Sequence, residues 1–588
     1  MTFNANAKFQ VQIYSRDHWG ADDRFATEAE AVARARKLIG VRTCEGVRVM
    51  REGRANGAFT ETEVYKEMQR VNKPVTISPI DEAPPCQSTE DLLGNRSRMT
   101  INRLLRGYVE QAVVTPTEIM HNYRELRRLM DKDTLLSSAV SRVAQLQTAA
   151  IAEAAPGGGE SAPGGGAKPP AGLAVRERRD ALFGMVNTVM TQAKKASEIK
   201  DPPDVRKLGF SATLERMQAT VAPEDASYCS LAMLSRDLVG RRDWLNKLDS
   251  LMSLIRREDA AAAEALGLLD GVVADVVGAP SVVKDLLGDQ ASLSAALSGL
   301  IDLSRGAFTG GAMVPADSPV WSLNEEIGGR GLGATVTVML DLVCRQFKSS
   351  QPLARAGDAG AEGAAFDELL ARVTSRDGVY GGGPMAEALV WRQGRFIEAG
   401  GATGRRQAIS DLLGRFSDPK DRVRFLMTLS NSELGRQQAS DLVGHLTHLT
   451  DGPAAAQLFV RGEPIRNNLS NVSLLFRQVR ESPLAPSQRD HLAGRVDETI
   501  ADYIVRNRVI ERLDNPEDHL RHRAIRLMQL CSPDVLCSPK TLAIAREHIV
   551  GLLRQPNFQE KFCEGLPPDE AERKVREFYG LLMQAGFR

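Results

Sequence analysis

The sequence predicts a mainly α protein in which a small N-terminal α/β module is followed by helical segments and two large all-helical blocks. Two observations predict this fold class. Apolar residues recur with a period of about 3.6 through most of the chain, as on one face of an α-helix, whereas they alternate in residues 8–68. Aromatic residues make up only 5% of the chain, and the abundant Ala, Leu and Arg favour helices. A chain of 588 residues exceeds what one hydrophobic core serves, so several domains are expected.

The N-terminal module, residues 1–70, is predicted to have the element order βαββ. Alternating apolar and polar side chains in residues 8–15 are typical of a half-buried strand. Thr27 is placed to cap a helix over 28–39. Alternation resumes on both sides of 53–57, which predicts a hairpin of two further strands.

Stretches rich in Pro and Gly divide the rest of the chain. Residues 71–94 are predicted to be a linker, because prolines there block regular structure. Residues 95–152 follow as a short helical segment, in which Pro116 stands at the first position of a helix. Residues 153–172, EAAPGGGESAPGGGAKPPAG, are predicted to be a disordered Pro/Gly linker. With a root-mean-square span of about 25 Å, it is expected to act as a tether between the parts of the chain on either side.

Two all-helical blocks complete the predicted organisation. The first covers 173–352, a flexible tract covers 353–365, and the C-terminal block covers 366–588. Short connections between amphipathic helices predict antiparallel neighbours, and a solenoid-like stacking is one arrangement of such pairs. No internal repeat with fixed residues occurs, so no repeat family is assigned. The last helix carries an apolar stripe that is expected to dock on the block, formed by Val575, Phe578, Tyr579, Leu582 and Met583.

The totals of charged residues and cysteines argue against several classes of protein. Lys plus Arg and Asp plus Glu are both 75, so the chain lacks the overall positive field of many proteins that bind nucleic acids or membrane surfaces. Seven cysteines without a CxxC pair fit reduced thiols in a cytoplasm rather than a disulfide framework. No stretch is long and apolar enough for a membrane span. We therefore expect a cytoplasmic protein without membrane insertion, and the preference for Arg, Ala and Gly suits a bacterial genome.

No motif identifies an enzymatic reaction. The Gly-rich stretch IGGRGLGA at 327–334 lacks the GxGxxG spacing and the preceding strand of a dinucleotide site, so we expect no cofactor. We interpret it as a loop that opens a helix. The nucleophile elbow GxSxG and the zinc motif HExxH do not occur. The sequence therefore predicts no catalytic residue and favours a protein without catalytic activity.

Four residues near the C-terminus are candidate metal ligands. His519 and His522 share one face of a predicted helix, and Cys531 and Cys537 follow it in the sequence. Two imidazoles and two thiolates form a set that zinc binds tetrahedrally. Their spacing matches no standard zinc finger, and buried cysteines beside solvated histidines are the stronger alternative. No metal is therefore predicted.

Arginines on two adjacent predicted helices form the candidate site for a polyanion. Such a face can neutralise phosphates through bidentate contacts. Acidic residues nearby offer these arginines other partners, and aromatic residues for base stacking are few, so a nucleic acid is not the expected partner. The candidates are Arg506, Arg508, Arg512, Arg521, Arg523 and Arg526.

The predicted function is that of a non-enzymatic, cytoplasmic interaction, scaffold or regulatory adaptor protein. Helical blocks in series expose long grooves that suit protein segments. We expect one or more protein partners, and a homo-oligomer is one form that this association can take. A nucleic-acid-associated protein that uses the Arg-rich helices is the first alternative. An unfamiliar helical enzyme or metal-binding protein is the second.

Overall fold

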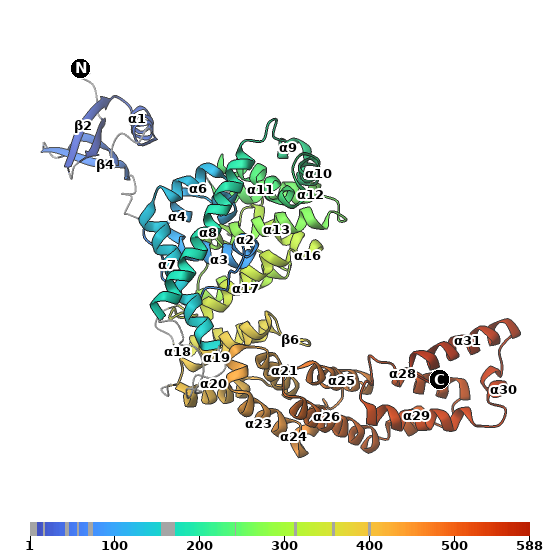
Figure 1. Cartoon of the computed structure of the whole chain (residues 1–588). Helices are drawn as coiled ribbons and strands as arrows, with labels where there is room; N and C mark the ends of the chain where they lie inside the picture. Colours follow the sequence, from blue (N-terminus) through green and yellow to red (C-terminus); the bar gives the residue numbers. More distant parts are fainter. Residues whose placement is uncertain are drawn as a thin grey trace, which may run out of the picture. The chain divides into compact units, whose positions relative to one another are not determined.

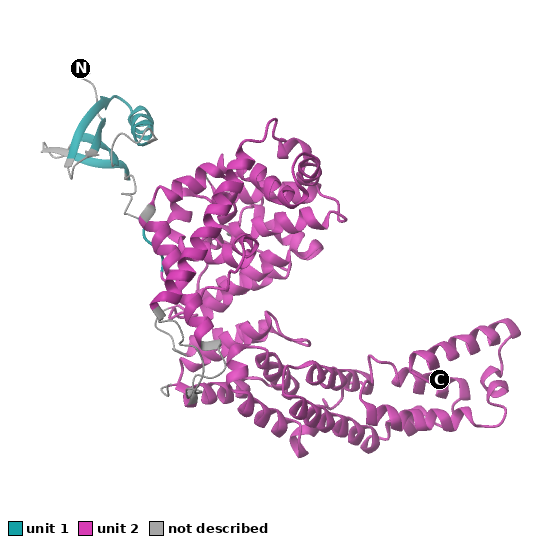
Figure 2. Ribbon diagram, viewed as in Figure 1, with its two compact units in different colours: residues 1–78 teal, residues 79–588 magenta. Residues whose placement is uncertain are grey.

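The chain folds into two compact units, Met1–Ser78 and Pro79–Arg588 (Figure 2). The first unit contains the predicted α/β module, and helices dominate the second (Figure 1). The computed structural model describes residues 9–15, 18–40, 46–55, 58–68, 75–154, 171–241, 243–310, 314–355, 359–397 and 401–587.

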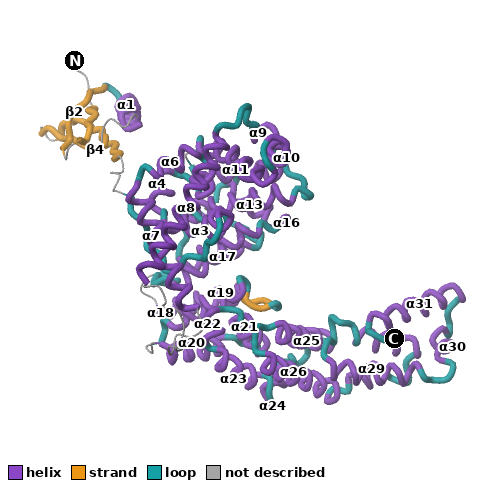
Figure 3. The backbone as a smooth tube through the Cα atoms, in the orientation of Figure 1, coloured by secondary structure: helices purple, strands orange, loops and turns teal. Residues whose placement is uncertain are grey.

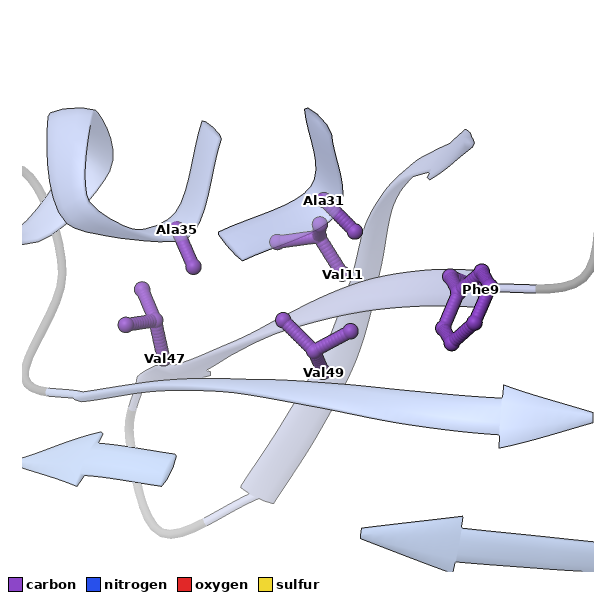
Figure 4. Packing of buried hydrophobic residues seen from close by; sticks show 6 residues of the cluster. All are labelled: Phe9, Val11, Ala31, Ala35, Val47 and Val49. Carbon is purple, nitrogen blue, oxygen red and sulfur yellow. The ribbon is translucent and has the colours of Figure 1, made fainter. Parts of the chain in front are cut away.

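The N-terminal unit is a four-stranded antiparallel sheet with one helix packed on it. Its elements are β1 Phe9–Ser15, β2 His18–Phe25, α1 Glu28–Gly40, β3 Gly46–Ala55 and β4 Ala58–Met68. The strands lie in the order β2-β1-β3-β4. Alternation places the apolar residues of β1 and β3 on one face, where the small alanines of α1 allow the helix to lie close. Figure 4 shows the resulting core, formed by Phe9, Val11, Ala31, Ala35, Val47 and Val49.

The strand β2 was not expected from the sequence, so the module has the order ββαββ rather than βαββ. Its sequence, HWGADDRF, lacks the alternation of apolar residues that marks a half-buried strand. It lies at the edge of the sheet, where its backbone pairs with β1 from Phe25 opposite Phe9 to His18 opposite Ser15. An edge strand needs only the backbone groups of its neighbour, and polar side chains are typical of such strands. The predicted helix cap is confirmed, because the Glu30 amide donates to Thr27 Oγ1 at 3.4 Å.

The first part of the second unit consists of sixteen helices in the described residues. They are α2 Thr89–Leu93, α3 Asn95–Leu104, α4 Arg106–Ala112, α5 Pro116–His121, α6 Tyr123–Met130, α7 Asp133–Ala154, α8 Ala171–Ser197, α9 Val205–Leu208, α10 Phe210–Thr220, α11 Pro223–Val239, α12 Trp244–Arg257, α13 Ala263–Val277, α14 Val282–Leu287, α15 Leu293–Ser304, α16 Pro319–Arg330 and α17 Gly333–Lys348. Local signals explain where several begin. Thr115 caps α5, and Glu118 closes a capping box around the predicted Pro116 in the first turn.

Residues 79–88, within the predicted linker 71–94, form no helix or strand but pack on α7 and α8. Arg142 of α7 donates to the carbonyl oxygen of Ile80 at 2.6 Å. Arg178 of α8 donates to the carbonyl oxygen of Cys86, whose side chain is buried between the same two helices. α7 and α8 also pack on each other. The predicted Pro/Gly linker between them falls mostly on residues 155–170, which lie outside the described residues.

The second part of this unit consists of fourteen helices and one short hairpin in the described residues. They are α18 Ala359–Val373, β5 Thr374–Ser375, β6 Gly378–Val379, α19 Gly382–Gly394, α20 Gly401–Arg415, α21 Pro419–Ser430, α22 Glu433–Gln437, α23 Ala439–Leu449, α24 Gly452–Ala456, α25 Ile465–Glu481, α26 Pro486–Arg506, α27 Val509–Leu513, α28 Leu520–Leu530, α29 Pro539–Leu553, α30 Phe558–Cys563 and α31 Pro568–Gln584. Figure 3 shows this hairpin in orange among helices. Helices close in sequence pack together, such as α19 with α20, α25 with α26, and α28 with α29.

The predicted mainly α fold class is confirmed, with α1 to α31 assigned in the described residues. Helix α18 begins inside the predicted tract 353–365, and Glu362 of this helix accepts the amides of Leu353 and Ala354 at 2.7 and 2.9 Å. The finer division of the second unit into blocks stays a prediction. No single helix in the described ranges is long and apolar enough to cross a membrane. α16 and α17 meet that requirement only together, and they bend by 114° at their junction.

Candidate functional site

A polar cavity of about 500 Å³ lies in the second unit, where α18, the β5–β6 hairpin, the connection from α20 to α21, and α25 meet. Hydroxyl and amide groups line it together with charged side chains. Basic groups outnumber acidic groups by four to three. The charged residues are Asp367, Arg376, Arg415, Asp418, Lys420, Asp421 and Arg424.

The start of α21 places two of these basic groups in the cavity wall. Asp418 caps the helix by accepting the Lys420 amide at 2.8 Å, and Pro419 occupies the first turn. Lys420 and Arg424 stand one helical turn apart and therefore share a face. They are only 4% and 6% exposed, which is rare for charged residues unless they are paired.

The ammonium group of Lys420 is loosely paired. Its Nζ lies 3.6 Å from Asp418 Oδ2 and 3.6 Å from Glu463 Oε2. Both distances exceed the length of a hydrogen bond, and no closer acceptor surrounds Nζ in the described part of the chain. Because an ammonium group carries three donors, Lys420 keeps hydrogen-bonding capacity for another acceptor.

The guanidinium group of Arg424 also has a donor to spare. It donates from one terminal nitrogen to Asp421 Oδ1 at 2.9 Å. Its Nε is buried and has no acceptor among the described residues. A buried donor of a charged group costs free energy when it is left unpaired. Nε is out of reach of a ligand, so the donor left for an occupant of the cavity is the other terminal nitrogen, which makes no hydrogen bond in the described chain.

The other two arginines of the cavity are held by the protein itself. Arg415 donates to Asp367 at 2.6 Å and to Gln393 at 2.8 Å. Arg376 donates to Ser470 at 2.9 Å. Arg376 is exposed, so water can serve its remaining donors, whereas Lys420 and Arg424 are buried with donors that the protein leaves unused.

A second cluster of charges is buried between α5, α12, α13 and α3. Lys247 of α12 forms an ion pair with Glu118 of α5, and both side chains are fully buried. Burial raises the pKa of Glu118 and lowers the pKa of Lys247, because each charged form loses its hydration. Asp275 of α13 accepts from Arg98 Nε at 3.0 Å and from Thr117 Oγ1 at 2.6 Å. Since each of these groups is bonded to another helix, we assign the cluster to holding the helices together.

His121 ends α5 beside this cluster and is buried. Its Nδ1 lies 2.9 Å from the carbonyl oxygen of Thr117, so the neutral ring carries its proton on Nδ1 and donates to that oxygen. The ring packs against Tyr228 with 4.5 Å between centroids. Burial lowers the pKa of His121 to about 3, so the ring is neutral at pH 7.

The four candidate metal ligands do not come together as a complete site. His519 caps α28, with Nδ1 accepting a backbone amide at 3.3 Å, and its ring centroid lies 6.0 Å from that of His522. Burial raises the pKa of Cys531 to about 11. Cys537 donates from Sγ to a carbonyl oxygen of α25 at 3.2 Å. No group of three or more His, Cys, Asp or Glu residues in the described ranges is arranged to hold a metal ion.

The six arginines predicted as a polyanion site divide into two groups. The guanidinium groups of Arg508 and Arg512 are exposed and have no partner within the described chain. Two free arginines do not make a continuous phosphate track. The other four donate to acceptors of the chain itself: Arg506 to Asp502, Arg521 to the carbonyl of Phe562, Arg523 to Asp514, and Arg526 to Asp518.

The predictions from sequence do not include Lys420 and Arg424, because charged residues of an amphipathic helix are expected on its exposed face. A signal is nevertheless present. Lys420, Val423, Arg424 and Met427 follow the i, i+3, i+4, i+7 spacing of one helix face. The valine and the methionine are both buried, so the two charges fall on the apolar side of α21.

Comparison with known proteins adds no identification. No protein-family model, no curated protein and no solved structure matches the chain. Function is therefore inferred from the residues of this chain.

Proposed function

We propose that this chain is a non-enzymatic protein–protein interaction protein, an adaptor or scaffold, in a bacterial cytoplasm. The observation that carries the proposal is an apolar stripe left exposed on the last helix, α31. Tyr579 and Met583 are 52% and 77% exposed, and half-buried Val575 continues the stripe one turn earlier. Residues four apart share a helix face, and adjoining exposed apolar side chains mark contact surfaces.

The opposite side of α31 is firmly docked, so the exposed stripe does not result from a loose helix. Phe578 and Leu582 are 2% and 5% exposed. Phe578 packs against two aromatic rings of α30, with centroid distances of 5.0 Å to Phe562 and 5.9 Å to Phe558. Phe578 and Leu582 therefore dock as expected from the sequence, whereas Tyr579 and Met583 remain available for contact.

Charged side chains of both signs surround the stripe, as in the polar rim of a protein interface. They pair with one another along α31 rather than forming a field of one sign. This arrangement favours a partner with an apolar groove or helix face over a polyanion. The pairs are Arg573 with Glu570 and Glu577, Lys574 with Glu577, and Arg576 with Glu572.

The test is affinity capture by the full-length chain followed by quantitative mass spectrometry. The double variant Tyr579→Lys/Met583→Lys changes exposed side chains, so its effect on folding is expected to stay within about 0.5 kcal/mol. Loss of a central interface anchor costs about 2 kcal/mol of binding free energy or more. The wild type should therefore capture at least one protein that the double variant does not.

The matched control is Arg576→Ala, on the same helix with a side chain that is 79% exposed. It removes only a surface ion pair and should capture the same proteins as the wild type. Equal capture by the wild type and the double variant would contradict the role of the stripe.

The stripe can also bind a second copy of this chain instead of a different protein. Light scattering during size-exclusion chromatography distinguishes the two cases. A wild-type dimer that becomes monomeric in the double variant would make the stripe a self-association surface and replace the adaptor proposal. A monomeric wild type, together with specific capture, supports a different partner protein.

A further inference from the structure

We propose that the polar cavity at the start of α21 binds a small phosphate monoester, with Lys420 and Arg424 holding the phosphate group. This inference goes beyond the proposed function, because the stripe on α31 takes no part in it. A failure of either proposal leaves the other standing.

The side chains of Lys420 and Arg424 are fixed in place and keep unused hydrogen-bond donors. Their side chains are only 5% and 6% exposed, so their positions are fixed by packing before any ligand arrives. Lys420 Nζ has carboxylate oxygens no closer than 3.6 Å, and one terminal nitrogen of Arg424 makes no hydrogen bond in the described chain. A phosphate group supplies several strong acceptor oxygens and pairs with arginine in charge-assisted hydrogen bonds.

The balance of charge limits how much anion the cavity can take. Four basic groups face three acidic groups in the lining, and Glu463 beside Lys420 supplies a fourth carboxylate. One phosphate group can bind between Lys420 and Arg424, whereas a polyanion would also meet Asp367, Asp418 and Asp421. The site is therefore assigned to a single phosphate monoester rather than to a nucleic acid strand.

The size and lining of the cavity indicate what the phosphate is attached to. A volume of about 500 Å³ lies within the range of small-molecule sites. Besides the charged groups, Thr374, Ser375, Ser417 and Asn471 offer hydroxyl and amide groups, and few lining residues are apolar. Such a lining matches the hydroxyl groups of a sugar or ribose. The ligand class is thus a sugar phosphate or a nucleoside monophosphate.

The test is isothermal titration calorimetry with the full-length chain. The probes are glucose 6-phosphate, AMP, their unphosphorylated counterparts glucose and adenosine, and inorganic phosphate. At least one ester should bind about 10-fold more tightly than its unphosphorylated counterpart. The ester that binds more tightly distinguishes a sugar phosphate from a nucleotide.

Three results with these probes overturn the proposal. One is equal binding of each ester and its unphosphorylated counterpart. Another is inorganic phosphate that binds as tightly as either ester, since the rest of the cavity would then contribute nothing. The third is an absence of binding by both esters at about 10 mM.

Substitutions in the cavity test whether the esters bind there. Arg424→Gln removes a charged donor and should weaken ester binding about 10-fold or more. Ser417→Asp adds an exposed carboxylate to the lining and should weaken it several-fold, whereas Ser417→Asn adds none and should not. Arg436→Gln removes an exposed arginine of α22 that pairs with Glu433, and it should leave binding unchanged.

Circular dichroism identifies any variant that fails to fold. If Arg424→Gln does not fold, the comparison of Ser417→Asp with Ser417→Asn decides. Wild-type affinity in every folded cavity variant would overturn the assignment.

Discussion

Replacing His121 with Gln is expected to remove a specific loss of stability between pH 7 and pH 5. Burial lowers the pKa of His121 to about 3 in the folded protein, from an ordinary value of 6.5 in an unfolded chain. Between these values the unfolded chain binds a proton that the folded chain does not. Because the folded pKa is the lower one, the contribution of His121 to stability is nearly complete above pH 7 and is lost as the pH falls through 6.5 toward 3.

The two pKa values determine the size of the effect. Proton linkage gives a loss of about 0.2 kcal/mol at pH 7 and about 2 kcal/mol at pH 5, with a limit of about 5 kcal/mol below pH 3. The full burial of the ring leaves no solvent to screen the effect. The step from pH 7 to pH 5 should therefore lower the free energy of opening around His121 by about 2 kcal/mol.

Hydrogen exchange of the α5 amides measures this free energy of opening directly. The exchange rates are first corrected for the intrinsic pH dependence of exchange. Between pH 7 and pH 5, the free energy of opening of α5 should then fall by about 2 kcal/mol more in the wild type than in His121→Gln. Amides of α26 in the same samples serve as the internal reference. Equal losses in the two proteins would refute the assignment of this acid sensitivity to His121.

The remaining predictions concern the packing of the second unit. Lys247→Met leaves the carboxylate of Glu118 buried without its partner and should cost about 3–5 kcal/mol. The double variant Lys247→Met/Glu118→Gln should recover most of this loss in urea unfolding, and a double variant no more stable than the single one would contradict the pairing. In Gly435→Ala the new Cβ would stand 1.9 Å from the carbonyl oxygen of Leu429, so the melting temperature should fall, with a cost of about 2 kcal/mol or more. Gly444→Ala, with open space around the new atom, should stabilise the protein by about 0.5–1 kcal/mol and so raise the melting temperature. Shifts of the melting temperature with the same sign in both variants would contradict this reasoning.

Periodicity predicts the fold class because burial of apolar side chains determines which face of each element points inward. The alternation in β1 and the spacing of Ala31 and Ala35 on α1 therefore predict the core of the first unit correctly. β2 carries no such pattern, since backbone pairing with β1 holds it in the sheet. An edge strand of this kind cannot be predicted from the spacing of apolar residues in a single sequence.

The polar sites could not be predicted because their members are brought together only by the tertiary fold. Arg98 and Asp275 are 177 positions apart, and no local pattern links them. Lys420 and Arg424 are close in sequence, yet a charged side chain in a helix is solvated far more often than buried. Their burial depends on how α18, the β5–β6 hairpin and α25 close over the start of α21.

Long-range contacts of this kind also join the helices on either side of the Pro/Gly stretch 153–172. The helices on either side of it, α7 and α8, pack on each other. The hydroxyl of Tyr228 of α11 donates to the carbonyl oxygen of Met120 at 2.7 Å and lies 3.3 Å from that of Val189, and so joins α5 before the stretch to α8 after it. A long connection between packed elements is tolerated because the entropy of loop closure grows only slowly with length. Helices α7 and α8 therefore belong to one compact unit, and the boundary between the two units falls at Ser78 and Pro79. The role of the stretch as a tether stays a prediction.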